Sequence, residues 1–139
     1  MRSEAFLDTS YAVALSAPKD ALHERAVALA RLLGMSRTRL ITTRAVLLEI
    51  GNFLSSSRSR VAAVELLSSM ENDPLIEIVP LSTDLYLKAF GLYKNRPDKE
   101  WGLIDCASFV VMGERGITEA LTADQHFEQA GFRALLLGS

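Results

Sequence analysis

Short apolar runs alternate along this chain with longer stretches of helical periodicity, and this alternation constrains the fold more than any other feature. The runs predict strands at residues 5–8, 40–42, 76–79, 119–122 and 134–137. Between them, helices are expected at residues 20–33, 43–54, 58–70, from 82 onward, 103–112 and 124–130. Strands that alternate with helices build a parallel sheet covered on both faces. We therefore expect an α/β fold of three α/β/α layers, with a mostly parallel sheet of about four to five strands.

Local signals support these helices. Spacings of three and four residues place several apolar side chains on one helical face, namely Leu22, Ala26, Leu29 and Leu33. Thr43 and Ser82 each precede a helical stretch, where a hydroxyl can accept a hydrogen bond from an unpaired backbone N–H. Residues 103–112 are almost wholly apolar and too numerous for an ordinary strand, so they predict a buried helix.

Chain length and cysteine content limit the possible settings of this protein. With 139 residues, 49% of them hydrophobic, the chain can form one compact domain over residues 1–139. Cys106 is the single cysteine, so no intramolecular disulfide can form and a reducing environment is expected. Acidic residues interrupt the N-terminal apolar segment, and no uncharged apolar stretch approaches about 18 residues. We expect a cytoplasmic protein that does not enter a membrane.

The net charge of −2 argues against a generally basic nucleic-acid binder, but the charge is unevenly distributed. Between residues 31 and 60, Glu49 is the single acid, against the arginines Arg31, Arg37, Arg39, Arg44, Arg58 and Arg60. These arginines predict either a basic stripe that holds phosphates or an ordinary solvated face. Charge alone leaves both interpretations open.

Four acids occupy positions that call for an explanation. Asp8 ends one predicted strand and Asp124 follows another, at the edge where parallel sheets place their ligand sites, although each could be a simple helix cap or turn residue. Glu49 borders an apolar helical face, where it needs either an arginine such as Arg44 or a metal ion. Asp105 lies in the first turn of the most apolar helix, where the helix dipole also favours an acid.

Together these four acids predict a metal site. Gathered carboxylates repel one another and raise each other's pKa unless a divalent cation neutralises them. Oxygen ligands of this kind suit Mg²⁺ or Mn²⁺, and the chemistry that such a site supports is phosphodiester hydrolysis. The four acids are therefore candidate catalytic residues.

Other chemistries find less support. Cys106 lies in an apolar helix as a small core residue, and two separated histidines give no zinc pattern. The chain has no phosphate-binding or dinucleotide-binding glycine motif. A phosphatase with an aspartyl nucleophile would carry a second acid where Ser10 stands. Trp101 could stack on a base, but packing in the core is the preferred interpretation.

Four motifs, in order along the whole chain, resemble those of PIN-domain ribonucleases, including the toxins of VapBC toxin–antitoxin pairs. They are Phe6–Tyr11, Leu48–Phe53, Asp98–Phe109 and Leu121–Phe127, followed by Gln129–Phe132. No single motif is specific, but their order is. The departures from the family pattern are Gly102 and Ile104, where members often carry hydroxyl residues that orient the metal ligand.

The resemblance implies roles for the acids. Asp8 and Asp105 correspond to direct Mg²⁺ (or Mn²⁺) ligands, while Glu49 and Asp124 correspond to residues that hold the metal or its waters and position the attacking water. Asp98 is expected to form a salt pair in a solvated loop. Whether Asp98, Ser10, Asn52 or Arg44 assists stays open.

The resemblance also implies partners. They are an RNA substrate, a small antitoxin that blocks the site, and a second copy of the chain in a homodimer formed through apolar helices. The alternative function is a PIN fold without turnover, serving as an RNA- or protein-binding subunit. The intact set of four acids argues against that alternative, because a degenerate member need not retain all of them.

Overall fold

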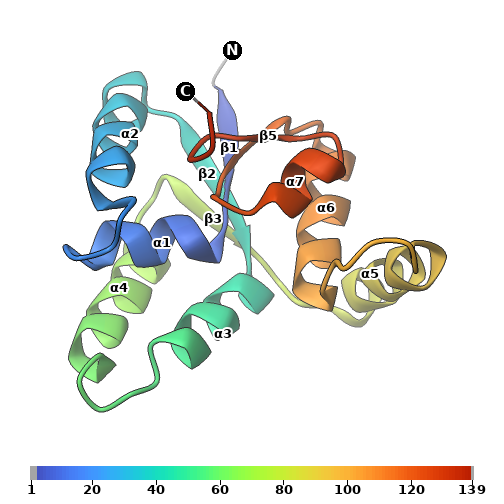
Figure 1. Cartoon of the computed structure of the whole chain (residues 1–139), viewed down its shortest axis with the longest axis horizontal. Coiled ribbons are helices and arrows are strands. Elements are labelled where there is room, and N and C mark those ends of the chain that lie inside the picture. The colour runs from blue at the N-terminus through green and yellow to red at the C-terminus, as the bar shows by residue number, and fades with distance from the viewer. Residues whose placement is uncertain (1–2, 139) are drawn as a thin grey trace.

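Five parallel strands form the centre of the computed structural model, which describes residues 3–138 (Figure 1). They are β1 (Glu4–Leu7), β2 (Arg39–Thr43), β3 (Ile76–Val79), β4 (Glu119–Leu121) and β5 (Arg133–Ala134). Their order across the sheet is β3-β2-β1-β4-β5. In the register of the central strand, Phe6 of β1 lies opposite Ile41 of β2 and Ala120 of β4. The predicted α/β fold with its parallel sheet is confirmed.

Helices cover both faces of this sheet. Figure 1 shows α1 (Thr9–Ser16), α2 (His23–Ser36) and α4 (Arg60–Asn72) on one side. The other side carries α5 (Thr83–Asn95), α6 (Leu103–Arg115) and α7 (Gln125–Gln129). The remaining helix, α3 (Arg44–Phe53), continues directly from β2 beyond the carboxyl edge of the sheet. The layers are therefore helices, sheet and helices, as expected.

Two of the predicted helix caps are present as expected. The side chain of Thr43 accepts a hydrogen bond from the Val46 N–H at 3.2 Å, and α3 begins at the next residue. Ser82 caps α5 in the same way, accepting from the Leu85 N–H at 3.1 Å. Each hydroxyl satisfies one of the backbone donors that have no partner within the first turn of a helix.

Several helix ends differ from the prediction by about three residues, as at α2 and α6, and two other elements differ more. The short helix α1 was not expected as a separate element. Its residues Tyr11–Ala14 are all buried, so the sequence there shows no apolar stripe confined to one helical face. Strand β5 ends at Ala134, whereas a strand was expected as far as residue 137. The chain turns there instead, since the Leu137 N–H bonds back to the Ala134 carbonyl at 3.1 Å. Leu135 and Leu136 still donate backbone hydrogen bonds to Ala120 and Thr122, and the apolar character of the segment reflects burial of Leu136.

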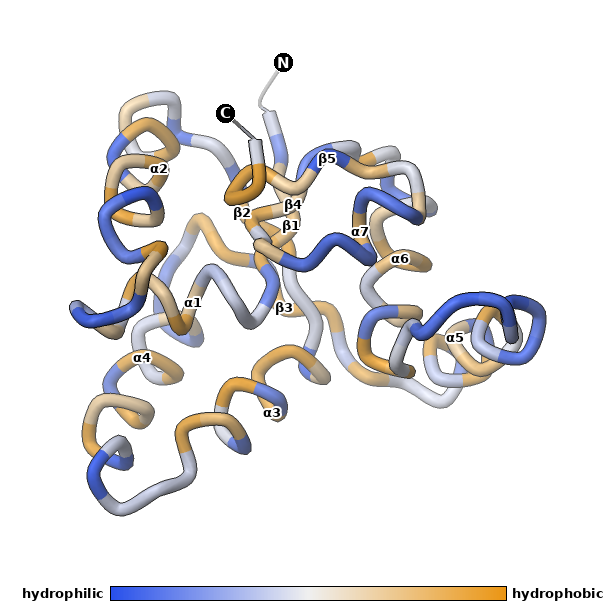
Figure 2. The backbone as a smooth tube through the Cα atoms, viewed as in Figure 1, coloured by the Kyte–Doolittle hydropathy of each residue, from blue (hydrophilic) through white to orange (hydrophobic). Residues whose placement is uncertain are grey.

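The core lies on both faces of the sheet. Phe6 and Ile41 are fully buried in the strands, as are Ile50, Met112 and Phe127 in the surrounding helices. Figure 2 shows the hydrophilic segment that leads into α7, in contrast to the apolar strands. No helix among residues 3–138 combines the length and apolar character needed to cross a membrane.

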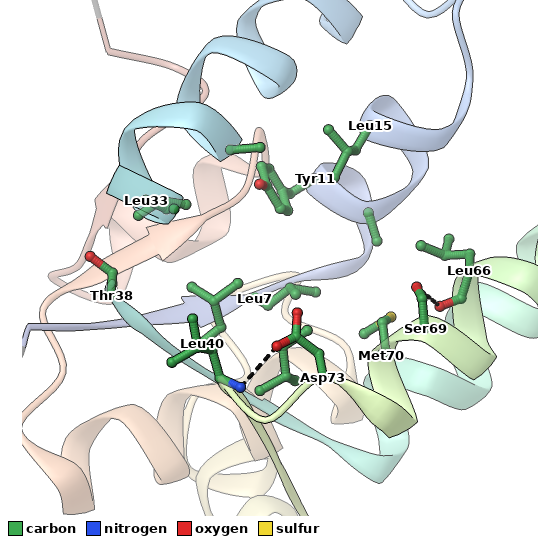
Figure 3. A pocket seen from close by; sticks show the side chains of 15 residues that line it. Leu7, Tyr11, Leu15, Leu33, Thr38, Leu40, Leu66, Ser69, Met70 and Asp73 are labelled. Atoms are coloured by element: carbon green, nitrogen blue, oxygen red, sulfur yellow. Dashed lines mark hydrogen bonds between the residues drawn. The ribbon is translucent and has the colours of Figure 1, made fainter. Parts of the chain in front are cut away.

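An apolar pocket of about 240 Å³ lies between α1, α2, α4 and the sheet (Figure 3). Tyr11, Leu33, Leu40 and Leu66 point into it, and most of the other lining residues are apolar, the exceptions being Thr38, Ser69 and Asp73. None of the four acids singled out from the sequence lines this pocket. The acids gather elsewhere.

Candidate functional site

A second pocket, of about 360 Å³, lies at the carboxyl edge of the sheet and contains all four acids. Asp8 directly follows β1 and Asp124 follows β4, and these two strands are neighbours, so their ends meet. Glu49 reaches the pocket from α3, and Asp105 from the first turn of α6. The structure thus brings together residues that are more than 100 positions apart in the chain.

Asp8 is buried, with only 5% of its surface exposed. It stands at the cap position of α1, yet its side chain forms no capping hydrogen bond, so the simple cap interpretation does not hold. The Thr122 hydroxyl donates instead to Asp8 Oδ2 at 2.7 Å. Burial raises the pKa of Asp8 to about 7. Hydrogen bonds from the Thr122 hydroxyl and the Thr9 backbone N–H oppose this rise, and the charges of Glu49 and Asp105 add to it.

Ser10 and Thr122 form a chain of hydroxyls behind Asp8. Thr122 has one hydroxyl hydrogen and gives it to the carboxylate, so Ser10 must donate in the 3.1 Å contact between the two hydroxyls. Ser10 Oγ accepts from the Ala123 N–H at 2.9 Å, and Thr122 Oγ1 accepts from the Asp124 N–H at 3.0 Å. This network fixes Asp8 relative to the segment that carries Asp124.

Glu49 is half-buried and accepts a hydrogen bond from the Thr9 hydroxyl. Arg44 forms its ion pair with Glu71 and not with Glu49. Within residues 3–138, Glu49 takes part in no ion pair. The interpretation that Glu49 is the structural partner of Arg44 is therefore wrong.

Asp105 and Asp124 each accept a hydrogen bond from a backbone N–H at the start of a helix. Asp105 Oδ2 accepts from the Gly102 N–H at 3.1 Å, and Asp124 Oδ1 accepts from the His126 N–H at 2.8 Å. The capping interpretation is thus correct for Asp124, although its carboxylate also faces the pocket. Burial raises the pKa of Asp105, and the charges of Asp124 and Glu49 raise it further, against the lowering effects of Gly102 and His126.

His126 also lines the pocket, although the sequence pattern gave it no role. Its Nδ1 lies 3.4 Å from Asp105 Oδ2 and 3.3 Å from Asp124 Oδ1. One ligand atom from each of these three residues can be chosen so that all lie within 4.8 Å of one another. Its position in the sequence could have indicated this role, because His126 lies in the first turn of the helix that Asp124 caps, at the same edge of the sheet as the acids.

Several other expectations are tested by the geometry. Asp98 is exposed and pairs with Arg96 at 3.1 Å, as expected. Cys106 is fully buried, as expected of a core residue. Trp101 is buried edge-on against Phe109, with ring centroids 5.0 Å apart, which confirms the packing interpretation.

The arginines between residues 31 and 60 do not form one basic stripe. Arg39 begins β2 and pairs with Glu77, whereas Arg44 begins α3, beyond the other end of β2, and pairs with Glu71. The others are spread over α2, its C-terminal cap and the start of α4, namely Arg31, Arg37, Arg58 and Arg60. The solvated-face interpretation is therefore the better one.

The acidic pocket fits a divalent cation. Five carboxylates line it, those of the four acids singled out from the sequence and that of Asp20, which accepts a hydrogen bond from the Leu22 N–H at 2.8 Å. Burial and acidic neighbours raise the pKa values of Asp8 and Asp105. The buried Nδ1 of His126 has no hydrogen-bond partner within the described chain. A cation at this position would neutralise the mutual repulsion and accept the unpartnered nitrogen as a ligand.

Comparisons with known proteins agree with this geometry. The PIN domain family matches residues 5–133. The chain is 29% identical over 127 residues to VapC20 of Mycobacterium tuberculosis, described as a 23S rRNA-specific endonuclease, in the strains CDC 1551 / Oshkosh and ATCC 25618 / H37Rv. The match covers 91% of this chain and 94% of the relative.

Comparison with solved structures also finds VapC20. The crystal structure of M. tuberculosis VapC20, described as a sarcin-ricin loop cleaving toxin, matches with a TM-score of 0.80 at 28% identity, over 94% of this chain and 96% of that one. FitAcB from Neisseria gonorrhoeae shares the fold, with a TM-score of 0.64 at 19% identity over 94% of each chain. The resemblance found in the sequence motifs is confirmed: this chain belongs to the PIN-domain family and is a homologue of VapC toxins.

Proposed function

We propose that this protein is an endoribonuclease that depends on Mg²⁺ or Mn²⁺ and acts as the toxin of a toxin–antitoxin pair. The observation that carries the proposal is the meeting of Asp8, Glu49, Asp105 and Asp124 in one pocket at the carboxyl edge of the sheet. The similarity to an endonuclease described as specific for 23S rRNA supports RNA as the substrate.

In this proposal Asp8 and Asp105 hold the ion. When bound, the ion supplies charge neutralisation for the substrate phosphate and lowers the pKa of water. Glu49 and Asp124 would hold the ion or its waters and position the attacking water. One of these carboxylates would take a proton from that water as its oxygen bonds to phosphorus, while the P–O bond to the leaving ribose oxygen breaks and that oxygen takes a proton from solvent. The hydroxyls of Thr122 and Thr9 orient two of these carboxylates, since Thr122 donates to Asp8 and Thr9 donates to Glu49.

Cleavage of purified 23S rRNA tests this function. The wild type should cut the RNA with Mg²⁺ or Mn²⁺, and EDTA should stop cleavage. Asp8→Asn keeps the acceptor for Thr122 but removes the charge, and should lower the cleavage rate by about 100-fold or more. Asp98→Asn is the matched control, because Asp98 is an exposed acid that pairs with Arg96 and does not line the pocket.

The proposed function fails if cleavage is insensitive to EDTA or if Asp8→Asn cuts as fast as the wild type. A wild type that binds 23S rRNA tightly and cuts neither it nor any other RNA tested would favour the non-catalytic binding subunit instead.

We also propose two protein partners. Apolar side chains are exposed on α3 and α4 as a surface for a second copy of the chain, namely Leu48, Phe53, Val61 and Val64. A self-complementary patch of this kind is the usual basis of a twofold dimer. The second partner is a small antitoxin that covers the acidic pocket with a cationic side chain. Light scattering measures the dimer, and inhibition of cleavage by the co-expressed partner measures the antitoxin.

A further inference from the structure

We propose that His126 supplies a nitrogen ligand to the ion in the acidic pocket, and that this ligand gives the pocket a preference for Mn²⁺ over Mg²⁺. The proposal rests on the metal-dependent function proposed above and adds the identity of one ligand and of the preferred ion. It concerns a residue to which the acidic pattern of the sequence gave no role.

The position of the His126 ring nitrogen is the first step. Nδ1 is buried, and within the described residues it has no hydrogen-bond partner. It nevertheless lies close to two carboxylate oxygens, 3.4 Å from Asp105 Oδ2 and 3.3 Å from Asp124 Oδ1. A buried polar atom without a partner costs on the order of 1–3 kcal/mol, so its place among two acids requires an explanation.

The second step is the way the two carboxylate oxygens are held. Each already accepts a backbone hydrogen bond, Asp105 Oδ2 from Gly102 and Asp124 Oδ1 from His126 itself. These bonds fix both oxygens relative to the starts of α6 and α7. The ring nitrogen therefore faces a rigid pair of acceptors and is not aligned with either of them.

The spacing of these atoms suits a shared cation. Neighbouring ligand atoms around an octahedral ion with bonds of about 2.1 Å are about 3 Å apart, and slightly farther apart around a tetrahedral ion. The two separations of 3.3 and 3.4 Å are close to these values. Small adjustments of the side chains would place one oxygen of Asp105, one oxygen of Asp124 and Nδ1 of His126 on the same ion.

The chemistry of this ligand set decides which ion it prefers. Mg²⁺ strongly favours oxygen ligands and keeps several of its waters. Imidazole favours first-row transition ions, so replacing one oxygen by a ring nitrogen strengthens Mn²⁺ relative to Mg²⁺. We expect the wild type to bind Mn²⁺ roughly tenfold more tightly than Mg²⁺, with His126 responsible for most of the difference.

The chain provides a matched control, because it contains two histidines. The other one, His23, is engaged elsewhere: its Nδ1 contacts the Ala14 carbonyl oxygen at 2.8 Å, and it does not line the acidic pocket. Any imidazole that binds the ion must therefore belong to His126 or His23, and single substitutions distinguish the two.

The experiment uses Mn²⁺ as the probe on the full chain without a histidine tag. Electron paramagnetic resonance measures free Mn²⁺ and hence its Kd, competition gives the Kd for Mg²⁺, and electron spin echo modulation detects directly bound ¹⁴N. The wild type and His23→Phe should show imidazole modulation, and His126→Phe should lose it. The Kd for Mn²⁺ should rise about tenfold or more in His126→Phe, with a smaller change for Mg²⁺.

A conservative variant and a folding control complete the design. His126→Asn places an amide near the position of Nδ1; it should lose the imidazole modulation and bind Mg²⁺ at least as well as the wild type, because an oxygen can replace the nitrogen. Melting in EDTA checks that each variant folds. The spectrum of the wild type decides the main point even if a variant does not fold.

Two results would overturn the proposal in different ways. Bound Mn²⁺ without nitrogen modulation in the wild type, or modulation that depends on His23, would remove His126 from the ligand set and leave the metal-dependent nuclease intact. If the wild type binds no Mn²⁺ at all, the metal dependence proposed for the function fails as well.

Discussion

Asp8 is the most deeply buried of the four acids, and its surroundings favour the protonated form. Burial raises its pKa to about 7, even though the Thr122 hydroxyl and the Thr9 backbone N–H donate hydrogen bonds to it. Without a counter-charge, this carboxyl group is therefore close to half-protonated at neutral pH. A divalent cation would favour the ionised form, so ion binding and proton release at Asp8 are expected to be linked.

Asp8 should make the stability of the metal-free protein depend on pH. The unfolded chain releases the Asp8 proton near pH 3.8 and the folded chain near pH 7. Between these values the folded state holds more protons, so the free energy of unfolding falls as the pH rises. Urea unfolding in EDTA should show the wild type losing up to about 4 kcal/mol more than Asp8→Asn between about pH 4 and pH 8. Parallel curves for the two proteins would contradict the raised pKa of Asp8.

Glu49→Gln separates a role in the metal site from a role in stability. The side-chain amide retains an oxygen that can accept from the Thr9 hydroxyl, and the variant lowers the repulsion from Asp8 and Asp105. We expect a melting temperature in EDTA equal to or above that of the wild type, together with weaker Mn²⁺ binding and slower RNA cleavage. A variant that melts well below the wild type in EDTA and cleaves normally would exclude Glu49 from the site.

The sequence singled out four acids of the pocket and left a role for Ser10 open, but it indicated neither Asp20 nor Thr122 nor His126. A carboxylate at a strand end or beside an apolar stripe is conspicuous, so Asp8, Glu49 and Asp124 could be singled out. Hydroxyl residues are common in every context, and the partner of Asp8 is Thr122, 114 positions away. His126 gave no recognisable metal pattern because its neighbours in the cluster are carboxylates from two separate segments.

At the scale of the elements, periodicity predicted those helices that bury one face. It failed at α1, where Tyr11, Ala12, Val13 and Ala14 are all buried, because a helix packed on several sides shows no stripe. It also underestimated α6, which continues to Arg115 and ends at Gly116. Gly116 adopts a left-handed backbone with φ of 66°, so the stop signal was a glycine and not a change in hydropathy.

Alanine substitutions at two glycines test these helices, because they should change the stability of the protein in opposite directions. Gly91 lies inside α5, and a Cβ added there would meet no atom within 4 Å, so Gly91→Ala should stabilise the protein by about 0.5–1 kcal/mol. Gly116 has the same free space but a positive φ, so Gly116→Ala should destabilise by about 1 kcal/mol. Thermal melts of the two variants measure both effects, and shifts of the same sign would contradict the placement of Gly91 inside a helix and of Gly116 at a helix end.

At the scale of the whole molecule, strand order decides which residues meet. Asp8 and Asp124 come together because β1 and β4 are neighbours in the sheet, although most of the chain separates them. The alternation of strands and helices predicted parallel strands but not their order. The same gap explains the arginines: Arg39 and Arg44 are close in sequence, yet β2 carries them to opposite edges of the sheet. Proximity in sequence left a basic stripe and a solvated face equally open, and the topology favours the solvated face.

Ion binding to the acidic pocket should stabilise the entire fold. An ion that binds only the folded state adds about 2.7 kcal/mol at 100 times its Kd, which for a domain of this size raises Tm by on the order of 10 °C. The double variant Asp8→Asn/Asp105→Asn should melt cooperatively in EDTA and show no rise with Mn²⁺. Asp98→Asn/Glu100→Gln removes the same charge from exposed acids outside the pocket, and should keep the full rise. A wild type whose melting is indifferent to millimolar Mn²⁺, or an equal rise in both double variants, would contradict a metal site at these four acids.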